Sequence, residues 1–370
     1  MLTDIDKIND VVNKWDLNEG QKQLKRKILE EWRTCVEDEA IFNDLIKICE
    51  GFTYYSERLT AEHYKEIYGE MKKSISNFEE FFDKSIFMPL RRKERMESAV
   101  DMFSNFRLAN ALDANKTYVD GPITFLTRYH RLCNDIQDQM EKHDSHVDKN
   151  NKIIAGLKKK LKYNWKDSKV KLKIQKKIEE IESLNKNYTN KLETEVRTFN
   201  DKYYHIKNII IIDDFIGTGE SVEKVINKIH EIINKYEIHI YLLVLEASAS
   251  GEQYIKSLAE KKNININIFY SKKSIDVLEE NVIFPSGYII SARKMVEEIN
   301  KKFRLPKKPF CKNHAIASFV NAPNNNLVLL SSGSYSWKPI FLRTNRNENR
   351  KKEIDKKQLN DIMSSIKNLK

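Results

Sequence analysis

Between residues 207 and 270 the chain alternates strand-like and helix-like segments, and this alternation restricts the fold more than any other feature. Lys207–Ile212 and Ile238–Leu245 are short apolar runs, and Asn265–Tyr270 has a similar pattern. Between them, apolar residues recur every three or four positions over Ser221–Tyr236 and Glu252–Lys261. Strand and helix segments of these lengths predict a parallel sheet with crossover helices, and therefore an α/β fold.

The stretch Asn208–Ser221, NIIIIDDFIGTGES, contains the most informative group of residues in the chain. Its four consecutive isoleucines predict a strand that is buried on both faces. Asp213 and Asp214 follow at the carboxyl end of this strand, the end where open α/β sheets bind ligands. The loop that comes next contains two glycines and opens a helix, so its backbone amides and hydroxyl side chains suit an anion. A carboxylate pair beside such a loop indicates a phosphorylated sugar, with magnesium held through water.

This stretch resembles the phosphoribosyl-pyrophosphate (PRPP) motif of the type I phosphoribosyltransferases, in which four apolar residues, two acids and two apolar residues precede a Thr-Gly-x-Thr/Ser loop. The resemblance implies that Asp213 and Asp214 are the catalytic pair, hold the ribose hydroxyls and bind Mg2+ through water. It also implies that the following residues bind the 5-phosphate: Phe215, Ile216, Gly217, Thr218, Gly219, Glu220 and Ser221. This sequence departs from the commonest form of the motif at two positions. Gly217 stands where that form has a small polar or aliphatic residue, and Glu220 stands where it has a glycine. An incidental strand–loop–helix is the alternative to such a site.

Two segments near the C-terminus carry a second resemblance: Asn321–Leu327 (NAPNNNL), and Trp337–Phe341 (WKPIF) with Arg343 shortly after it. They are similar to a divergent phosphoribosyltransferase-like branch encoded in bacterial conflict (anti-phage) loci, including some retrons. This resemblance implies an effector or accessory protein of a defence system, with a reverse transcriptase and its DNA among the expected partners. Asn321, Asn324 and Asn325 are candidate ligand contacts, although ordinary turn-forming residues between two strands explain them equally well.

A loop that would receive the pyrophosphate is expected after the first strand of the core. Ser85–Leu90 (SIFMPL) predicts that strand, and a cationic stretch follows it: Arg91, Arg92 and Lys93. These three side chains could neutralise a leaving pyrophosphate, but a solvated basic turn is an equally good interpretation. Ser98, at the start of the next helix, and the turn at residues 120–122 are further candidates.

The net charge of +11 does not describe the whole chain, because two segments contain all of the excess. Residues 151–200 carry +8 and residues 343–370 carry +5, which leaves −2 for the rest. In the first segment Ile174, Ile178 and Ile181 follow the four-three spacing of a coiled coil, and this predicts a protruding antiparallel helical hairpin. Basic side chains of this hairpin and of the C-terminal segment could bind the phosphates of nucleic acids, and Tyr163 and Trp165 could stack on bases. A solvated coiled-coil surface and a protein–protein contact are the alternatives.

The predicted organisation is a phosphoribosyltransferase-type (Rossmann-like) α/β core with helical additions. The parts are an N-terminal helical region (1–82), the core (83–135 and 201–342), the inserted basic hairpin (136–200) and a basic C-terminal helix (343–370). Within the core, strands are also expected at Ala315–Val320 and Leu327–Leu330.

Scattered cysteines and a charged N-terminus predict a soluble cytoplasmic protein. The four cysteines form no CxxC pair, which argues against a zinc module and against a disulfide framework. Apolar runs are too short to span a bilayer, so no membrane partner is expected, while oligomerisation is left open. The leading functional hypothesis is a phosphoribosyltransferase that depends on Mg2+ and PRPP. The alternative is a non-catalytic module that retains the fold and binds a nucleotide or a nucleic acid.

Overall fold

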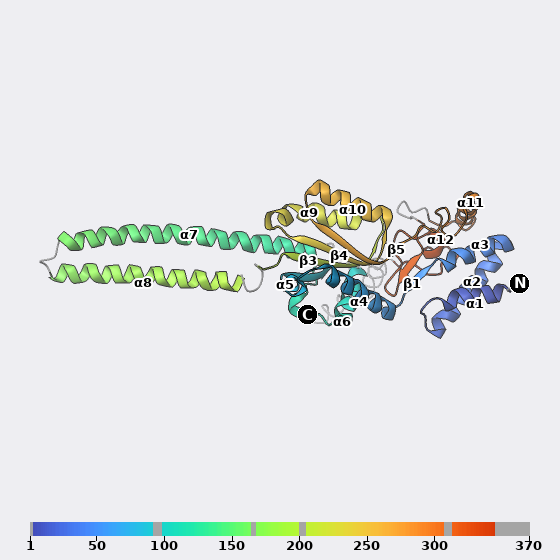
Figure 1. The fold of residues 1–370 in the computed structure, drawn as a ribbon, viewed down its shortest axis with the longest axis horizontal. Helices are drawn as coiled ribbons and strands as arrows, with labels where there is room; N and C mark the ends of the chain where they lie inside the picture. The colour runs from blue at the N-terminus through green and yellow to red at the C-terminus, as the bar shows by residue number, and fades with distance from the viewer. Residues whose placement is uncertain (1–2, 92–97, 164–167, 200–204, 307–312, 345–370) are drawn as a thin grey trace, which may run out of the picture.

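The computed structural model describes residues 3–91, 98–163, 168–199, 205–306 and 313–344. At its centre is a sheet of four parallel strands in the order β2-β3-β4-β5 (Figure 1). The strands are β2 (Ser85–Pro89), β3 (Asn208–Ile216), β4 (His239–Ser248) and β5 (Ile266–Ser274). The helices that cross between β3, β4 and β5 are α9 (Glu220–Tyr236) and α10 (Ala249–Lys262). The α/β fold predicted from the alternating pattern is therefore confirmed.

Helices cover both faces of this sheet, because successive strand residues point into two different apolar clusters. Ile209 and Ile211 of β3 belong to one cluster, while Ile210 and Ile212 belong to the other. The helices on the first face are α9, α10 and the start of α7 (Pro122–Tyr163). Those on the second face are α4 (Glu57–Ser74), α5 (Phe78–Asp83) and α6 (Ser98–Ala109). None of the four isoleucines is more than 1% exposed, as expected for a strand buried on both faces.

A second core joins the N-terminal helices to the C-terminal part of the chain. The N-terminal helices are α1 (Asp4–Asn13), α2 (Glu19–Val36) and α3 (Glu39–Glu50). The C-terminal elements are α11 (Ser286–Lys302), β6 (Ile316–Ser318), which pairs with β1 (Thr53–Tyr55), and α12 (Val328–Ser331). Trp32 of α2 stacks on Trp337 with 4.5 Å between the ring centroids, and both side chains are 1% exposed. Residues from opposite ends of the chain therefore stabilise one another.

A buried carboxylate connects this second core to the central sheet. Glu246 of β4 is 3% exposed and accepts a hydrogen bond of 2.9 Å from the hydroxyl of Tyr55 in β1. Lys272, the register partner of Glu246 on β5, donates to the hydroxyl of Thr53 at 3.1 Å. Burial raises the pKa of Glu246 above its ordinary value, and the charge of Lys272 acts against this rise. β1 is thereby held beside the carboxyl ends of β4 and β5.

An antiparallel helical hairpin, formed by α7 and α8 (Ser168–Phe199), projects from the central sheet (Figure 1). The first turns of α7 pack on the sheet through Phe125 and Leu126. Farther out, Ile154, Ile178 and Ile181 form a separate apolar cluster between the two arms. The tip around residues 164–167 and the basic segment beyond Thr344 lie outside the described residues.

One of the expected strands is wrong. Leu327–Leu330 was predicted as a strand, whereas Val328–Ser331 forms the short helix α12. A run of four buried apolar residues fits either structure, so periodicity alone could not distinguish them. The other expected strand exists, because β6 lies within the predicted range Ala315–Val320. Among the described residues, no helix combines the length and the apolar character that crossing a membrane requires.

Candidate functional site

The candidate site lies at the carboxyl end of β3, where this strand passes into α9. The strand continues beyond Ile212, the last strand residue predicted, so that Asp213 and Asp214 belong to it. Tyr64 of α4 donates a hydrogen bond of 2.9 Å to the main-chain oxygen of Asp213. The amide of Asp214 donates to the Asp213 carboxylate at 3.0 Å. The backbone of the acid pair is thus fixed from the neighbouring helix, and one carboxylate is oriented by the backbone itself.

The electrostatics of Asp214 depend on two residues that are distant in sequence. Burial raises the pKa of Asp214 above its ordinary value, since a low-dielectric environment disfavours the charged form. A hydrogen bond from the hydroxyl of Ser98 and the positive charge of Arg343 oppose this rise. The sequence predicts Ser98 as a candidate for the pyrophosphate site, whereas Arg343 is only part of the C-terminal segments that carry the second resemblance. Burial, together with the charges of the two acids, also raises the pKa of the Tyr64 hydroxyl well above its ordinary value.

The loop between β3 and α9 has the conformation that an anion site requires. Gly219 adopts a left-handed conformation with φ of 78° and occupies the N-cap position of α9. Because glycine has no side chain, it provides no cap for the first-turn amides of the helix. These amides and the positive end of the helix dipole can therefore face an anionic ligand. Thr218 and Ser221 line the same pocket and add two hydroxyl groups.

The start of α10 holds this loop in place through contacts that the sequence analysis missed. The hydroxyl of Ser248 donates a hydrogen bond of 2.5 Å to the main-chain oxygen of Gly217 and accepts one of 2.9 Å from the amide of Gly251. A Cβ atom at Gly251 would lie 2.1 Å from that same oxygen. Position 251 therefore requires glycine, because any side chain would collide with the backbone of the loop. The Ser-Ala-Ser-Gly sequence at the end of β4 was the available signal.

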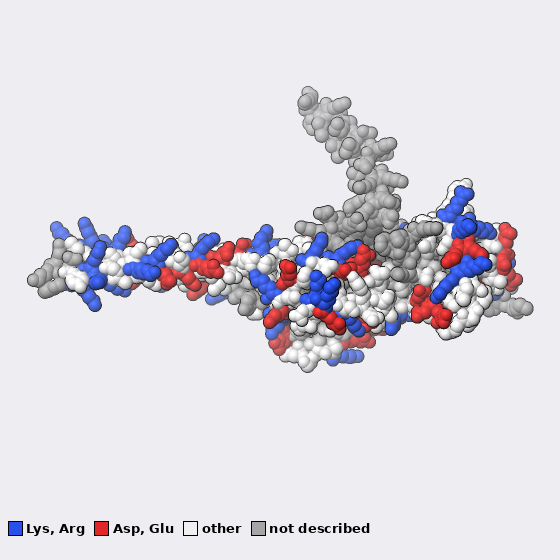
Figure 2. Space-filling model, turned by 90° about the horizontal axis from the view of Figure 1, so that it is seen from above, with Lys and Arg blue, Asp and Glu red and all other residues white. Residues whose placement is uncertain are grey.

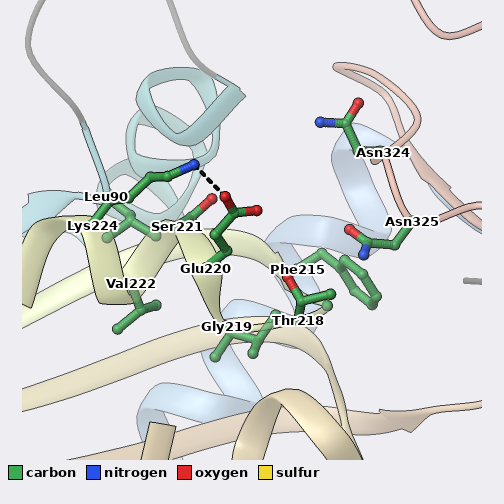
Figure 3. Close-up of a pocket in the computed structure, with 12 residues that line it drawn as sticks. Leu90, Phe215, Thr218, Gly219, Glu220, Ser221, Val222, Lys224, Asn324 and Asn325 are labelled. Carbon is green, nitrogen blue, oxygen red and sulfur yellow. Dashed lines mark hydrogen bonds and ion pairs between the residues drawn. The ribbon is translucent and has the colours of Figure 1, made fainter. Parts of the chain in front are cut away.

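A pocket of about 270 Å³ opens over the loop (Figure 3). Its lining comes from three parts of the chain: Leu90 after β2, residues 215–222 with Lys224 from β3 and α9, and Asn324 and Asn325 from the C-terminal turn. All seven residues predicted to bind the 5-phosphate line this pocket, from Phe215 to Ser221. The acid pair directly precedes Phe215 in β3 and is not itself part of the lining. Leu90, Val222 and Lys224 were not predicted.

Glu220 introduces a negative charge at the edge of the loop between β3 and α9. Its carboxylate forms an ion pair of 2.5 Å with Lys224, one helical turn farther along α9 (Figure 3). Acid and lysine at positions i and i+4 are a common helical pair, so this contact could have been predicted from the sequence. The pair balances the charge of Glu220, and both residues remain exposed enough to meet a ligand.

The asparagine-rich turn contains positions that line the pocket and positions that stabilise the fold. Asn325 packs directly on the loop, because a Cβ atom at Gly217 would lie 2.6 Å from the Asn325 side chain. Asn326, which was not predicted, is fully buried. Its side-chain oxygen accepts a hydrogen bond from the amide of Ile316, and its side-chain nitrogen donates one to the main-chain oxygen of Ile316. Asn321 does not line the pocket, and its side-chain amide donates to the main-chain oxygen of Thr344 at 2.9 Å. The turn thus brings two of the three predicted asparagines, Asn324 and Asn325, to the site.

Only one residue of the expected pyrophosphate loop falls among the described residues. Arg91 lies 3.3 Å from the carboxylate of Asp120, and Arg92 and Lys93 lie outside the described residues. Gly121, with φ of 83°, approaches so closely that a Cβ atom there would lie 2.8 Å from the Arg91 Cβ. The turn at residues 120–122 therefore packs against the end of β2, next to Leu90 of the pocket.

The described residues contain no group of three or more histidine, cysteine or acidic side chains that could hold a metal ion by themselves. Asp213 and Asp214 are adjacent carboxylic acids, and the main-chain amide of Asp214 donates to the Asp213 carboxylate. Such a pair fits Mg2+ that keeps several waters and takes its other ligands from a phosphorylated substrate, which is the usual mode of Mg2+ binding.

One comparison with known proteins gives a match that covers this site. A protein-family model described as PRTase-CE matches residues 136–343, which is more than half of the 370-residue chain. The match includes β3, the acid pair, the loop and the asparagine-rich turn. No curated protein and no solved structure matches the chain. The chain therefore belongs to the PRTase-CE family, a phosphoribosyltransferase-type family.

Proposed function

We propose that the chain binds PRPP, or another ligand with a ribose 5-phosphate group, together with Mg2+. The observation that carries this proposal is the acid pair at the end of β3, directly followed by an uncapped helix N-terminus that lines a pocket. In this arrangement Asp213 and Asp214 hold the ribose hydroxyls, and the loop from Phe215 to Ser221 holds the 5-phosphate. Membership of the PRTase-CE family supports this assignment.

The proposed reaction is transfer of the phosphoribosyl group, or its reversal by pyrophosphate. The bond from C1 to the pyrophosphate oxygen breaks, positive charge develops on the ribose ring, and an acceptor nucleophile attacks C1. The acid pair stabilises this charge and orients the ring. Asp213 and Asp214 would hold Mg2+ through water, and the ion would supply charge neutralisation to the departing pyrophosphate. Arg91 would lie near the leaving group once it exchanges Asp120 for the ligand.

Calorimetry with PRPP and MgCl2 tests binding directly. The native chain is expected to release heat with a single-site isotherm, and the double variant Asp213→Asn/Asp214→Asn is expected to bind at least about tenfold more weakly, because two charged contacts are lost. The matched control is Glu297→Gln/Glu298→Gln, an adjacent acid pair that is exposed on α11. Absence of binding by the native chain, or equal weakening by both double variants, would overturn the proposal.

A non-catalytic module that binds a nucleotide is the second candidate. Two observations favour it: Arg91 is already paired with Asp120, and Glu220 places a carboxylate beside the phosphate loop. The two candidates differ in turnover. Incubation with PRPP, Mg2+ and a mixture of nucleobases, followed by a pyrophosphate assay, should show pyrophosphate release only if the chain is an enzyme.

We also propose that the chain acts in anti-phage defence, as an effector or accessory protein. The support is the similarity of Asn321–Leu327 and Trp337–Phe341 to the conflict-associated branch, together with the family match. Expression of the chain with its neighbouring genes should reduce phage plating, and Asp213→Asn/Asp214→Asn should abolish this protection. Equal protection by the variant would show that the acid pair has no part in defence.

A further inference from the structure

Charge is unevenly distributed along the hairpin formed by α7 and α8. Residues 157–163 and 168–178, at the far ends of the described parts of α7 and α8, contain nine lysines and no acidic residue. The two arms that connect this end to the sheet, residues 136–156 and 179–199, contain nine acidic and six basic residues. Figure 2 shows lysines gathered at the far end and acidic side chains closer to the body of the molecule. We call residues 157–163 and 168–178 the basic tip.

The lysines of the basic tip point away from the interface between the two helices. Its inner positions are apolar, and Ile178, the last residue of the tip, is buried together with Ile154 and Ile181 of the two arms. The described lysines of the tip are all exposed: Lys158, Lys159, Lys160, Lys162, Lys169, Lys171, Lys173, Lys176 and Lys177. Lys158 forms an ion pair across the hairpin with Glu182 at 3.2 Å. The packing of the hairpin therefore does not require most of these charges.

The density of positive charge matches that of a nucleic-acid duplex. Residues 168–178 of α8 rise about 15 Å along the helix axis, at about 1.5 Å per residue. Double-stranded DNA carries about one negative charge per 1.7 Å, so a segment of this length carries about nine charges. The tip has a net charge of +9 over the same distance. We propose that the basic tip binds the phosphate backbone of double-stranded nucleic acid, independently of its sequence.

The dimensions of the tip favour the backbone of a duplex over its bases. Two helices side by side are about 20 Å across, whereas the major groove is about 12 Å wide and admits one helix. Tyr163, 76% exposed, is the one aromatic side chain among the described residues of the tip, which leaves little for stacking on single-stranded bases. The acidic arms repel a polyanion, and they confine the contact to the end of the hairpin, far from the PRPP pocket.

Fluorescence polarisation with a labelled DNA duplex of about 20 base pairs, measured from about 50 to 300 mM salt, tests this proposal. The tip variant replaces five exposed lysines by glutamine: Lys159, Lys162, Lys171, Lys173 and Lys176. The matched control replaces five exposed lysines of the arms by glutamine: Lys142, Lys149, Lys152, Lys186 and Lys191. The tip variant should bind at least about tenfold more weakly, with a salt slope lower by about 4, and the control should bind like the native chain.

Lysine and glutamine have similar helix propensities, so circular dichroism should show the same helix content in all three proteins. Vesicles of phosphatidylcholine and phosphatidylserine serve as a second polyanion. The proposal is overturned if the native chain does not bind the duplex at low salt, or if it binds only the vesicles. It is also overturned if the tip variant binds as well as the native chain, or if both variants lose affinity equally.

Discussion

The side chain of Asp214 is partly buried at the end of β3, and desolvation raises its pKa despite the opposing contributions of Ser98 and Arg343. A carboxyl group with a raised pKa binds its proton more tightly in the folded chain than in the unfolded chain. The folded state is therefore penalised progressively as the pH rises from the ordinary value of 3.8 to the raised pKa of the folded state, and the penalty is complete above that pKa. Functional acids often cost stability in this way.

Asp214→Asn should consequently stabilise the fold at neutral pH, while it weakens ligand binding. The gain should shrink as the pH is lowered through the raised pKa toward 3.8, because the native side chain then becomes neutral as well. Thermal unfolding at a series of pH values measures this difference, with Asp113→Asn, an exposed aspartate, as the control. A gain that does not change with pH would contradict the prediction.

Glu220 is the second residue whose effect can be isolated. Its carboxylate stands at the pocket edge, where it opposes a phosphate and neutralises Lys224. Glu220→Gln should tighten binding of inorganic phosphate or PRPP about fivefold, which corresponds to about 1 kcal/mol for one charge a few ångströms away in a solvated site. Glu231→Gln, exposed on the same helix, should leave the affinity unchanged. Weaker binding by Glu220→Gln would mean that the carboxylate contributes to the ligand site.

At the scale of elements, the candidate site depends on the contact between the loop that joins β3 to α9 and the asparagine-rich turn. Gly217 allows Asn325 to pack on the loop, because a Cβ atom at position 217 would lie 2.6 Å from the side chain of Asn325. Gly217→Ala should therefore displace Asn325 and reduce PRPP affinity several-fold, with a smaller effect on stability. Gly287→Ala is the control, because no atom lies within 4 Å of the position of its Cβ. Titration calorimetry and thermal unfolding of both variants separate the two effects.

The strand–loop–helix part of the site could be predicted from the sequence, because its residues are contiguous. Four isoleucines, two acids and a glycine loop specify a buried strand that opens a helix, and β3 and α9 follow this prediction closely. The contribution of Arg343 to Asp214 and the support from Ser248 could not be predicted, since these contacts depend on tertiary packing. The error at Leu327–Leu330 has a similar origin, because burial without periodicity does not distinguish a strand from a helix.

At the scale of the whole molecule, the second core couples both ends of the chain to the site. Trp337 stacks on Trp32, donates a hydrogen bond of 2.9 Å to the main-chain oxygen of Leu329, and lies in the segment that follows the asparagine-rich turn. Trp337→Ala should lower the free energy of unfolding by about 3–5 kcal/mol, as for other large side chains deleted from a core. Urea denaturation measures the change, and Tyr335→Ala, a fully exposed aromatic nearby, should have little effect. Equal effects of the two variants would contradict this view of the core.

The central claim is that a ribose 5-phosphate ligand binds where β3 passes into α9. Hydrogen–deuterium exchange of the native chain, with and without PRPP and Mg2+, tests it most directly. Slower exchange is predicted for peptides that contain residues 213–222 and 321–326, with no change in peptides from the hairpin arms. Protection that omits residues 213–222, or that appears only elsewhere in the chain, would contradict the claim.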